Sequence, residues 1–194
     1  MDDTDIISTV KIIEYNAKGN KALRNKKEYK LANPIKEKKD RVITKTKRWN
    51  TYLHSENDFE KERQLELLRQ LKLNVSTTQQ TQFLYSEIRK KMNGYRAQDM
   101  NKNKYNMEKF VDLGYTIDAL LDSELNCFYC KEQVYVWYIV AREPKQWTLE
   151  RIHNDIGHNK GNIEIACLNC NIRRQRIYYE KFRFTKQMII EKTG

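Results

Sequence analysis

The sequence predicts an α+β protein: a helical N-terminal and middle region, followed by a small C-terminal module of strands and a helix. Apolar residues recur at helical spacing between residues 55 and 125, and β-branched and aromatic residues follow between 133 and 166. All four cysteines lie in this second part, in two C-x-x-C pairs. We therefore expect a basic, partly disordered arm over 1–50, a helical region over 51–125, a compact module over 126–182 and a tail over 183–194.

The chain of 194 residues carries 37 Lys and Arg against 26 Asp and Glu, a formal net charge of +11. Residues 18–48 hold thirteen basic and three acidic side chains, and residues 171–194 hold seven basic and two acidic ones. This excess favours a polyanionic partner, although the arm can also be a solvated tail that only keeps the protein in solution. The sequence contains no run of about 18 apolar residues, so it predicts no membrane span. The acidic N-terminus is unlike a secretory signal, so we expect an intracellular protein that is not secreted and has no membrane partner.

Three helices are predicted in the helical region. The first covers 55–72, where Ser55 can cap the helix, Asp58 follows in a capping-box position, and leucines form an apolar stripe. The second covers 81–92, and Gly94 is expected to end it. The third pattern covers 105–125, with an interruption at Gly114. Packing against a core is the expected role of these amphipathic helices.

The four cysteines, Cys127, Cys130, Cys167 and Cys170, have the spacing of a metal site. Two C-x-x-C turns can place four thiolates at the corners of a tetrahedron, which is what a closed structural Zn²⁺ site requires. Disulfides are disfavoured because nothing indicates secretion. A redox pair needs only one C-x-x-C, in a βαβ context. Zinc would also supply folding free energy that so small a module lacks.

The segments around the second half of this site alternate between strand and loop patterns. Strands are predicted over 133–140, 147–152 and 163–166, with an Asn-, Asp- and Gly-rich loop between the last two. A helix begins near Asn171, with Ile172, Ile177 and Phe182 on its apolar face. The aromatic residues in and beside the first two strands are expected to pack around the zinc and not to stack on bases. They are Tyr135, Trp137, Tyr138 and Trp147.

The order strand, loop, strand and helix, with the second cysteine pair at the strand–helix junction, resembles the ββα-metal motif of HNH (His-Me finger) endonucleases. More closely, it is similar to the zinc-containing endonuclease VII-like branch and to HNH proteins of large DNA viruses. The elements that carry the resemblance are the first C-x-x-C, the strand Leu149-Glu150-Arg151-Ile152, the GH and GN of the loop, and C-x-x-C-N. It covers roughly residues 125–175.

The resemblance implies that one divalent cation, Mg²⁺ or Mn²⁺, polarises the scissile phosphate. Its ligands would be Glu150 and Asn171, whose carboxylate and amide oxygens suit such an ion. Alternatively, Glu150 is a solvent-facing strand residue that pairs with Arg151 or Lys160, and Asn171 only caps the helix. The resemblance also implies that Asn162 braces the loop by hydrogen bonds without taking part in the chemistry.

The general base is the point at which this chain departs from the family. Arg151 stands where the family has histidine, and a guanidinium cannot act as a base at neutral pH. His153 or His158 is expected to activate water instead, with a surface loop histidine as the alternative for each. Arg151 is expected to contact the phosphate or to stabilise developing charge.

The sequence thus predicts a zinc-containing endonuclease that hydrolyses DNA phosphodiester bonds. Arg173, Arg174 and Arg176, on the last helix, are candidates for phosphate contacts, with a solvated helix face as the alternative. The alternatives for the whole protein are a zinc-stabilised nucleic-acid-binding module without cleavage and a protein that coats DNA. The expected partner is duplex or branched DNA, and a homodimer is left open. The resemblance further implies a virus-encoded protein that acts in the host cell or the virion.

Overall fold

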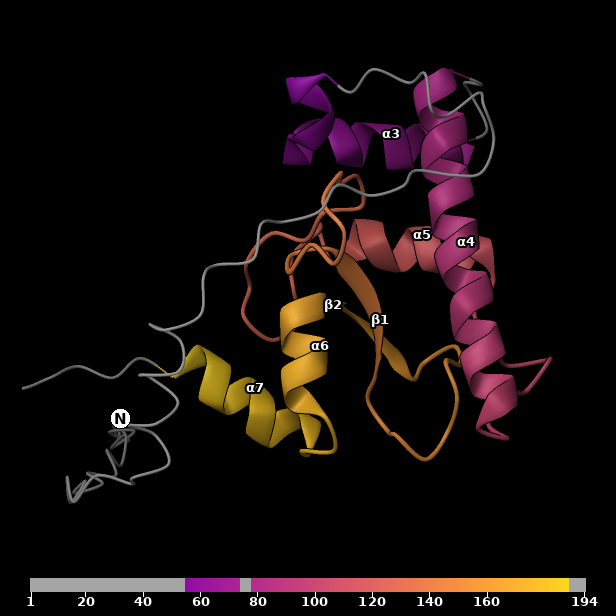
Figure 1. Ribbon diagram of the computed structural model, residues 1–194, viewed down its shortest axis with the longest axis vertical. Helices are drawn as coiled ribbons and strands as arrows, with labels where there is room; N and C mark the ends of the chain where they lie inside the picture. The colour runs from indigo at the N-terminus through magenta and orange to yellow at the C-terminus, as the bar shows by residue number, and fades with distance from the viewer. Residues whose placement is uncertain (1–54, 74–77, 189–194) are drawn as a thin grey trace, which may run out of the picture. The chain divides into compact units, whose positions relative to one another are not determined.

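The computed structural model describes residues 55–73 and 78–188 of the chain. All of them lie in one compact unit. This part of the chain contains five α-helices, a short 3-10 helix and a two-stranded antiparallel sheet (Figure 1), which confirms a mixed α and β fold. The basic arm expected over 1–50 lies outside the described residues, and the boundaries expected at 125 and 182 stay predictions.

The first helical pattern forms two pieces, the 3-10 helix η1 (Glu56–Phe59) and the helix α3 (Lys61–Leu73). The Ser55 N–H donates to the Asp58 carboxylate over 2.9 Å, as expected for a capping box. Glu60 has an extended backbone and separates η1 from α3, so the single helix predicted over 55–72 is interrupted there. The leucine stripe of α3 is buried, in agreement with the prediction.

The helix α4 (Gln79–Asn101) is longer than the sequence predicts. Its first turn is capped by Thr78, whose hydroxyl accepts the Thr81 N–H over 3.2 Å. The prediction that Gly94 ends the helix is wrong. Met92 and Asp99 are buried on either side of that glycine, and the packing of this face outweighs the weak helix propensity of one glycine.

The helix α5 (Leu113–Asp122) starts later than the pattern over 105–125 suggests. Asp112 sets its first residue, because the Asp112 carboxylate accepts the Tyr115 N–H over 2.8 Å. Before this cap the chain turns without forming a helix. The Asn106 side chain accepts the N–H groups two and three positions further on, at 3.0 Å each, and such a turn competes with helix formation.

The strand predicted over 133–140 does not form. Only isolated bridges occur there, from Gln133 to Asn126 and from Tyr135 to Gln146. The buried N–H groups of Val136 and Trp137 donate to a side chain instead, the Gln64 amide oxygen of α3, over 2.8 and 3.0 Å. A partner from a distant helix thus replaces the partner strand that the apolar pattern implied.

The sheet consists of β1 (Trp147–Arg151) and β2 (Ile163–Cys167), paired from Trp147 opposite Cys167 to Arg151 opposite Ile163. The helix α6 (Leu168–Arg174) follows β2 directly and packs on both strands. The helix α4 runs past β1 in Figure 1, and the Tyr95 hydroxyl accepts the Leu149 N–H over 3.1 Å. Elements thus pack on β1 from two sides, which buries its first four residues.

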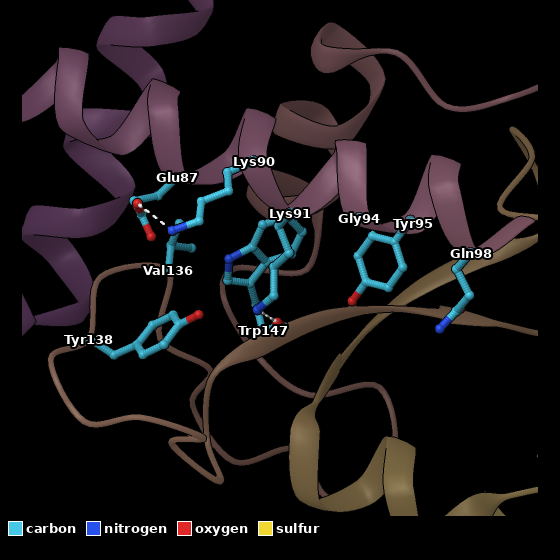
Figure 2. A pocket seen from close by; sticks show the side chains of 9 residues that line it. All are labelled: Glu87, Lys90, Lys91, Gly94, Tyr95, Gln98, Val136, Tyr138 and Trp147. Carbon is cyan, nitrogen blue, oxygen red and sulfur yellow. Dashed lines mark hydrogen bonds and ion pairs between the residues drawn. The ribbon is translucent and has the colours of Figure 1, made fainter. Parts of the chain in front are cut away.

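The contact between α4 and β1 also contains polar groups. Figure 2 shows Lys91 of α4 beside Trp147 of β1, with the ammonium 4.8 Å from the indole ring centre. The same ammonium donates to the Gln146 side chain over 3.0 Å and to the Trp147 carbonyl. Trp137 and Trp147 are buried in the core, whereas Tyr135 and Tyr138 are half-buried. That these four rings pack around a zinc ion stays a prediction.

The helix predicted from Asn171 onward is two helices. Gln175, with φ of 52°, ends α6, and α7 (Tyr179–Gln187) follows after a short turn. Phe182 is buried as expected, whereas Ile172 and Ile177 are exposed, which corrects the expected apolar face. The turn changes the direction of the chain, so the helical spacing that linked these residues in the sequence does not extend across it.

The Gln64 amide provides a test of how the helical region and the cysteine segment are joined. Gln64→Leu should lower the free energy of unfolding by about 2–5 kcal/mol, because two buried N–H groups lose their acceptor. Urea unfolding monitored by circular dichroism measures this change. The matched control Gln98→Leu alters an exposed glutamine of α4 and should change stability by less than about 0.5 kcal/mol. Equal effects of the two substitutions would contradict the assignment.

Candidate functional site

The four cysteines form one cluster. Their sulfur atoms all lie within 4.8 Å of one another, and the Cys130 and Cys167 sulfurs are 4.0 Å apart. Tetrahedral zinc with Zn–S distances of about 2.3 Å places its ligand sulfurs ~3.8 Å apart. None of the four forms a disulfide. The cluster can therefore hold a metal ion such as zinc, and four thiolates would leave no open position on it.

Local backbone geometry brings the two cysteine pairs together. In the first turn the Lys131 N–H donates to the Cys127 carbonyl over 3.0 Å, and Lys131 adopts φ of 59°. In the second turn Cys167 caps α6, and the Cys170 N–H donates to the Cys167 sulfur over 3.4 Å. The two turns meet because the Phe128 N–H donates to the Ile165 carbonyl of β2 over 2.8 Å.

Close contact between the thiols shifts their pKa values in opposite directions. Hydrogen bonding from Cys167 lowers the pKa of Cys127, and hydrogen bonding to Cys127 raises the pKa of Cys167 to about 12. The pKa of Cys170 is raised by the same contact with Cys127. These shifts arise because the thiols lie in hydrogen-bond contact with one another. A bound cation would let all four ionise and would release their protons.

The predicted ligands of the catalytic cation both lie where β1 meets α6. Glu150 is buried, and its carboxylate is bound by the Arg174 guanidinium. The Asn171 amide donates to the Thr148 hydroxyl over 3.1 Å, on the same side of β1. Burial raises the pKa of Glu150 although Arg174 opposes this shift. In this arrangement the carboxylate already has a cation, so the residues do not fit a divalent ion.

The expectation that Arg174 contacts nucleic acid is not met, because its side chain is only 2 % exposed. Besides Glu150, the guanidinium binds three backbone carbonyls, those of Arg151, Ile152 and Ile177, over 2.6, 2.8 and 3.0 Å. It therefore joins the end of β1 to the turn after α6. Arg173 and Arg176 are exposed, and their contact with nucleic acid stays a prediction.

The Asn162 side chain holds the backbone of the loop by hydrogen bonds. Its amide oxygen accepts the His153 N–H over 2.9 Å, and its amide nitrogen donates to the His153 carbonyl over 3.1 Å. The nitrogen also donates to the Gly157 carbonyl over 3.0 Å. A buried side chain thus holds both sides of the His153 backbone, which is the role that the resemblance implies.

The two candidate bases differ in access. His153 is exposed at the edge of the loop, with its ring centre 6.2 Å from that of Tyr179. His158 is buried, and Asp99 of α4 binds both its ring Nδ1, at 2.9 Å, and its backbone N–H, at 2.6 Å. His158 therefore holds the loop against α4, and only His153 is accessible to a substrate.

Asp99 is a site residue that the sequence analysis missed. Besides His158 it faces Arg151, whose guanidinium lies 3.9 Å from the Asp99 carboxylate. Arg151 therefore points toward α4, away from Glu150. Gly157 lets the loop approach, since a Cβ there would lie 2.7 Å from the Asp99 carboxylate and 2.5 Å from the Lys104 carbonyl. The GH pair of the loop was a sequence signal, but nothing in the sequence identified its partner 59 residues away.

Comparison with protein-family models, curated proteins and solved structures gives no match. Among the described residues, no helix is long and apolar enough to cross a membrane. The same residues contain one group of His, Cys, Asp or Glu side chains placed to hold a metal ion, the cysteine cluster.

The cysteine cluster predicts a metal content that can be measured directly. Purified protein should carry one zinc ion per chain by inductively coupled plasma mass spectrometry, and Cys170→Ser should lose it. The loss should lower the melting temperature by more than about 10 °C, since such a metal contributes to folding. Tyr85→Phe, a change on the exposed side of α4, should keep both the metal and the stability. A metal-free wild-type protein of unchanged stability would contradict the assignment.

His158 predicts an acid-sensitive contribution to stability. Burial lowers the pKa of its ring below the usual 6.5, although Asp99 opposes the shift. The unfolded chain therefore binds a proton more readily than the folded one, so this contribution is complete above pH 6.5 and is lost as the pH falls below it. The stability difference between wild type and His158→Asn should shrink between about pH 7.5 and about pH 5.5 in urea unfolding. His153→Asn, at an exposed histidine, should show no such trend, and a pH-independent difference for His158→Asn would refute the assignment.

Proposed function

We propose that the protein is a zinc-stabilised DNA endonuclease of the HNH class. The observation that carries the proposal is the clamp of Asn162 on the backbone of His153, which holds the segment that carries an exposed imidazole just beyond the end of β1. The support around it is the order β1, loop, β2 and α6, with Asn171 directly after Cys170. The fold supplies a rigid backbone at His153, which a catalytic base needs.

His153 is the base in this proposal because it is the accessible candidate. A neutral imidazole can accept a proton from water and act as a general base. The attacking water would lie beside this ring, and phosphate charge would be balanced by nearby cations such as Arg176. His158 holds the loop, and Asn162 positions His153 without touching the substrate.

The metal requirements of the proposal differ between the two sites. Zn²⁺ at the cysteine cluster would be structural, since four thiolates leave no position for substrate. Mg²⁺ or Mn²⁺ at Glu150 and Asn171 would compete with Arg174 for the same carboxylate. As they are arranged, the residues do not fit such an ion, and the proposed proton transfer to His153 does not involve it.

A non-catalytic nucleic-acid-binding protein is the second candidate. The buried Glu150–Arg174 pair favours it, because the carboxylate that the family uses for a cation is neutralised by the chain itself. Arg151 at the position of the family's base favours it as well. In this candidate the zinc module is a scaffold, and the exposed basic residues give a salt-dependent affinity for DNA.

A plasmid-nicking assay separates the two candidates. Wild-type protein should convert supercoiled DNA to the nicked form, and His153→Ala should slow nicking by roughly 100-fold or more through loss of the base. Arg69→Gln, a change of an exposed cation on α3, should nick at the wild-type rate. The assay is run with Mg²⁺, with Mn²⁺ and without added cation.

Nicking by His153→Ala at the wild-type rate would overturn the role of His153. Absence of nicking by wild type under all three conditions, together with DNA binding, would establish the second candidate. If nicking requires an added cation, Glu150→Gln tests whether Arg174 yields its carboxylate to that ion, and unchanged nicking by this variant would place the ion elsewhere.

A further inference from the structure

Two hollows flank His153 and share it. One, of about 560 Å³, lies between the loop after α4 and the loop after β1. The other, of about 460 Å³, lies between the loop after β1 and the C-terminal end of α6. Lys104, His153 and Asp155 line both. We call the two hollows together the His153 groove, because a chain that fills both must pass His153.

The charged groups of the His153 groove are mostly positive. Its cationic side chains are Lys104, Lys109, Lys160, Arg174 and Arg176, and its one carboxylate is that of Asp155. Arg174 is paired with Glu150, and Lys160 is paired with Asp112 at 2.5 Å. Among the described residues, the other three cations have no carboxylate within ion-pair distance. Their positive charge is available to phosphates on both sides of His153.

An aromatic ring stands on each side of the groove. Tyr178 lines the hollow at the end of α6 and is 56 % exposed. Tyr105 lines the other hollow, where the rings of Tyr105 and Phe110 are 5.4 Å apart and the Arg96 guanidinium lies 5.1 Å from the Tyr105 ring. Rings in a positively charged groove are stacking platforms for unpaired bases. Bases inside a duplex are already stacked on one another and do not offer their faces.

We propose that the His153 groove binds single-stranded DNA, with phosphates on Lys104, Lys109 and Arg176 and with bases against Tyr105 and Tyr178. The inference rests on the proposed function, since it makes the strand that passes His153 the one that is cut. The preferred substrate is then an unpaired or unwound strand, and an intact duplex is bound mainly through its backbone.

Fluorescence anisotropy tests the groove. A labelled oligonucleotide is titrated with full-length protein as a single strand, as the annealed duplex, and as RNA of the same sequence. The DNA single strand should bind more tightly than the annealed duplex, whose bases are already stacked, and no more weakly than the RNA. Tyr178→Ala should weaken its binding by roughly 5- to 100-fold with little effect on the duplex, because a base loses its stacking partner. Tyr85→Ala, at another exposed tyrosine, is the matched control.

The charges are tested by salt dependence. Lys109→Gln and Arg176→Gln should each reduce the slope of log affinity against log salt by about 1, whereas Lys90→Gln on α4 should leave it unchanged. Equal affinity for single strand and duplex, tighter binding of the RNA, or Tyr178→Ala behaving as Tyr85→Ala would each overturn the inference.

The outcomes distinguish this inference from the proposed function. Loss of single-strand binding in Tyr178→Ala, with no nicking by wild type, supports the groove and rejects the endonuclease. Nicking that depends on His153 but not on Tyr178 or Lys109 supports the endonuclease and rejects the groove.

Discussion

The convergence of four cysteine sulfurs within 4.8 Å is the constraint on which the C-terminal half of the molecule depends. It joins the turn at Cys127 and Cys130 to the point where β2 becomes α6. Because Cys167 both ends β2 and caps α6, the first turn of α6 is fixed relative to the strand that precedes it. This places Asn171 opposite Thr148 and Arg174 opposite Glu150, so the cluster determines which side chains meet on β1. A metal there is a structural element, and any chemistry must come from the surface it supports.

The Glu150–Arg174 pair lies on that scaffold, at the junction of β1 and α6. A carboxylate that is 94 % buried needs a positive partner, and Arg174 supplies one from the next turn of the helix after Asn171. Four hydrogen bonds hold the guanidinium, so its removal would expose a strongly unfavourable buried charge. The same interaction stabilises the junction of β1 and α6 and occupies the oxygen that a catalytic cation would require. The Arg174 guanidinium, which stabilises the fold, and a catalytic cation would therefore compete for the same carboxylate.

Local patterns predicted the elements whose partners lie nearby in the sequence. The cysteine spacing, the two strands β1 and β2 and the Ser55–Asp58 cap all depend on residues within about twenty positions of one another or on a repeated spacing. The bracing position of Asn162 came from the family resemblance. The errors involve longer distances. The stretch 133–140 has a strand composition, yet Gln64, more than seventy residues earlier, takes its buried N–H groups. Gly94 looked like a helix end, yet tertiary packing on both sides carries α4 through it.

By itself, the sequence determined the α+β class, the cysteine cluster, and the set of histidines and carboxylates from which a site can be built. Only the tertiary structure decided which of these groups is accessible. Asp99 binds the ring of the buried His158, and Arg174 pairs with the buried Glu150. Asn162 holds the backbone of His153, whose side chain is exposed. The physical reason is that accessibility and charge pairing depend on which side chains meet across 59 or 24 positions of the chain, and no local periodicity encodes those encounters.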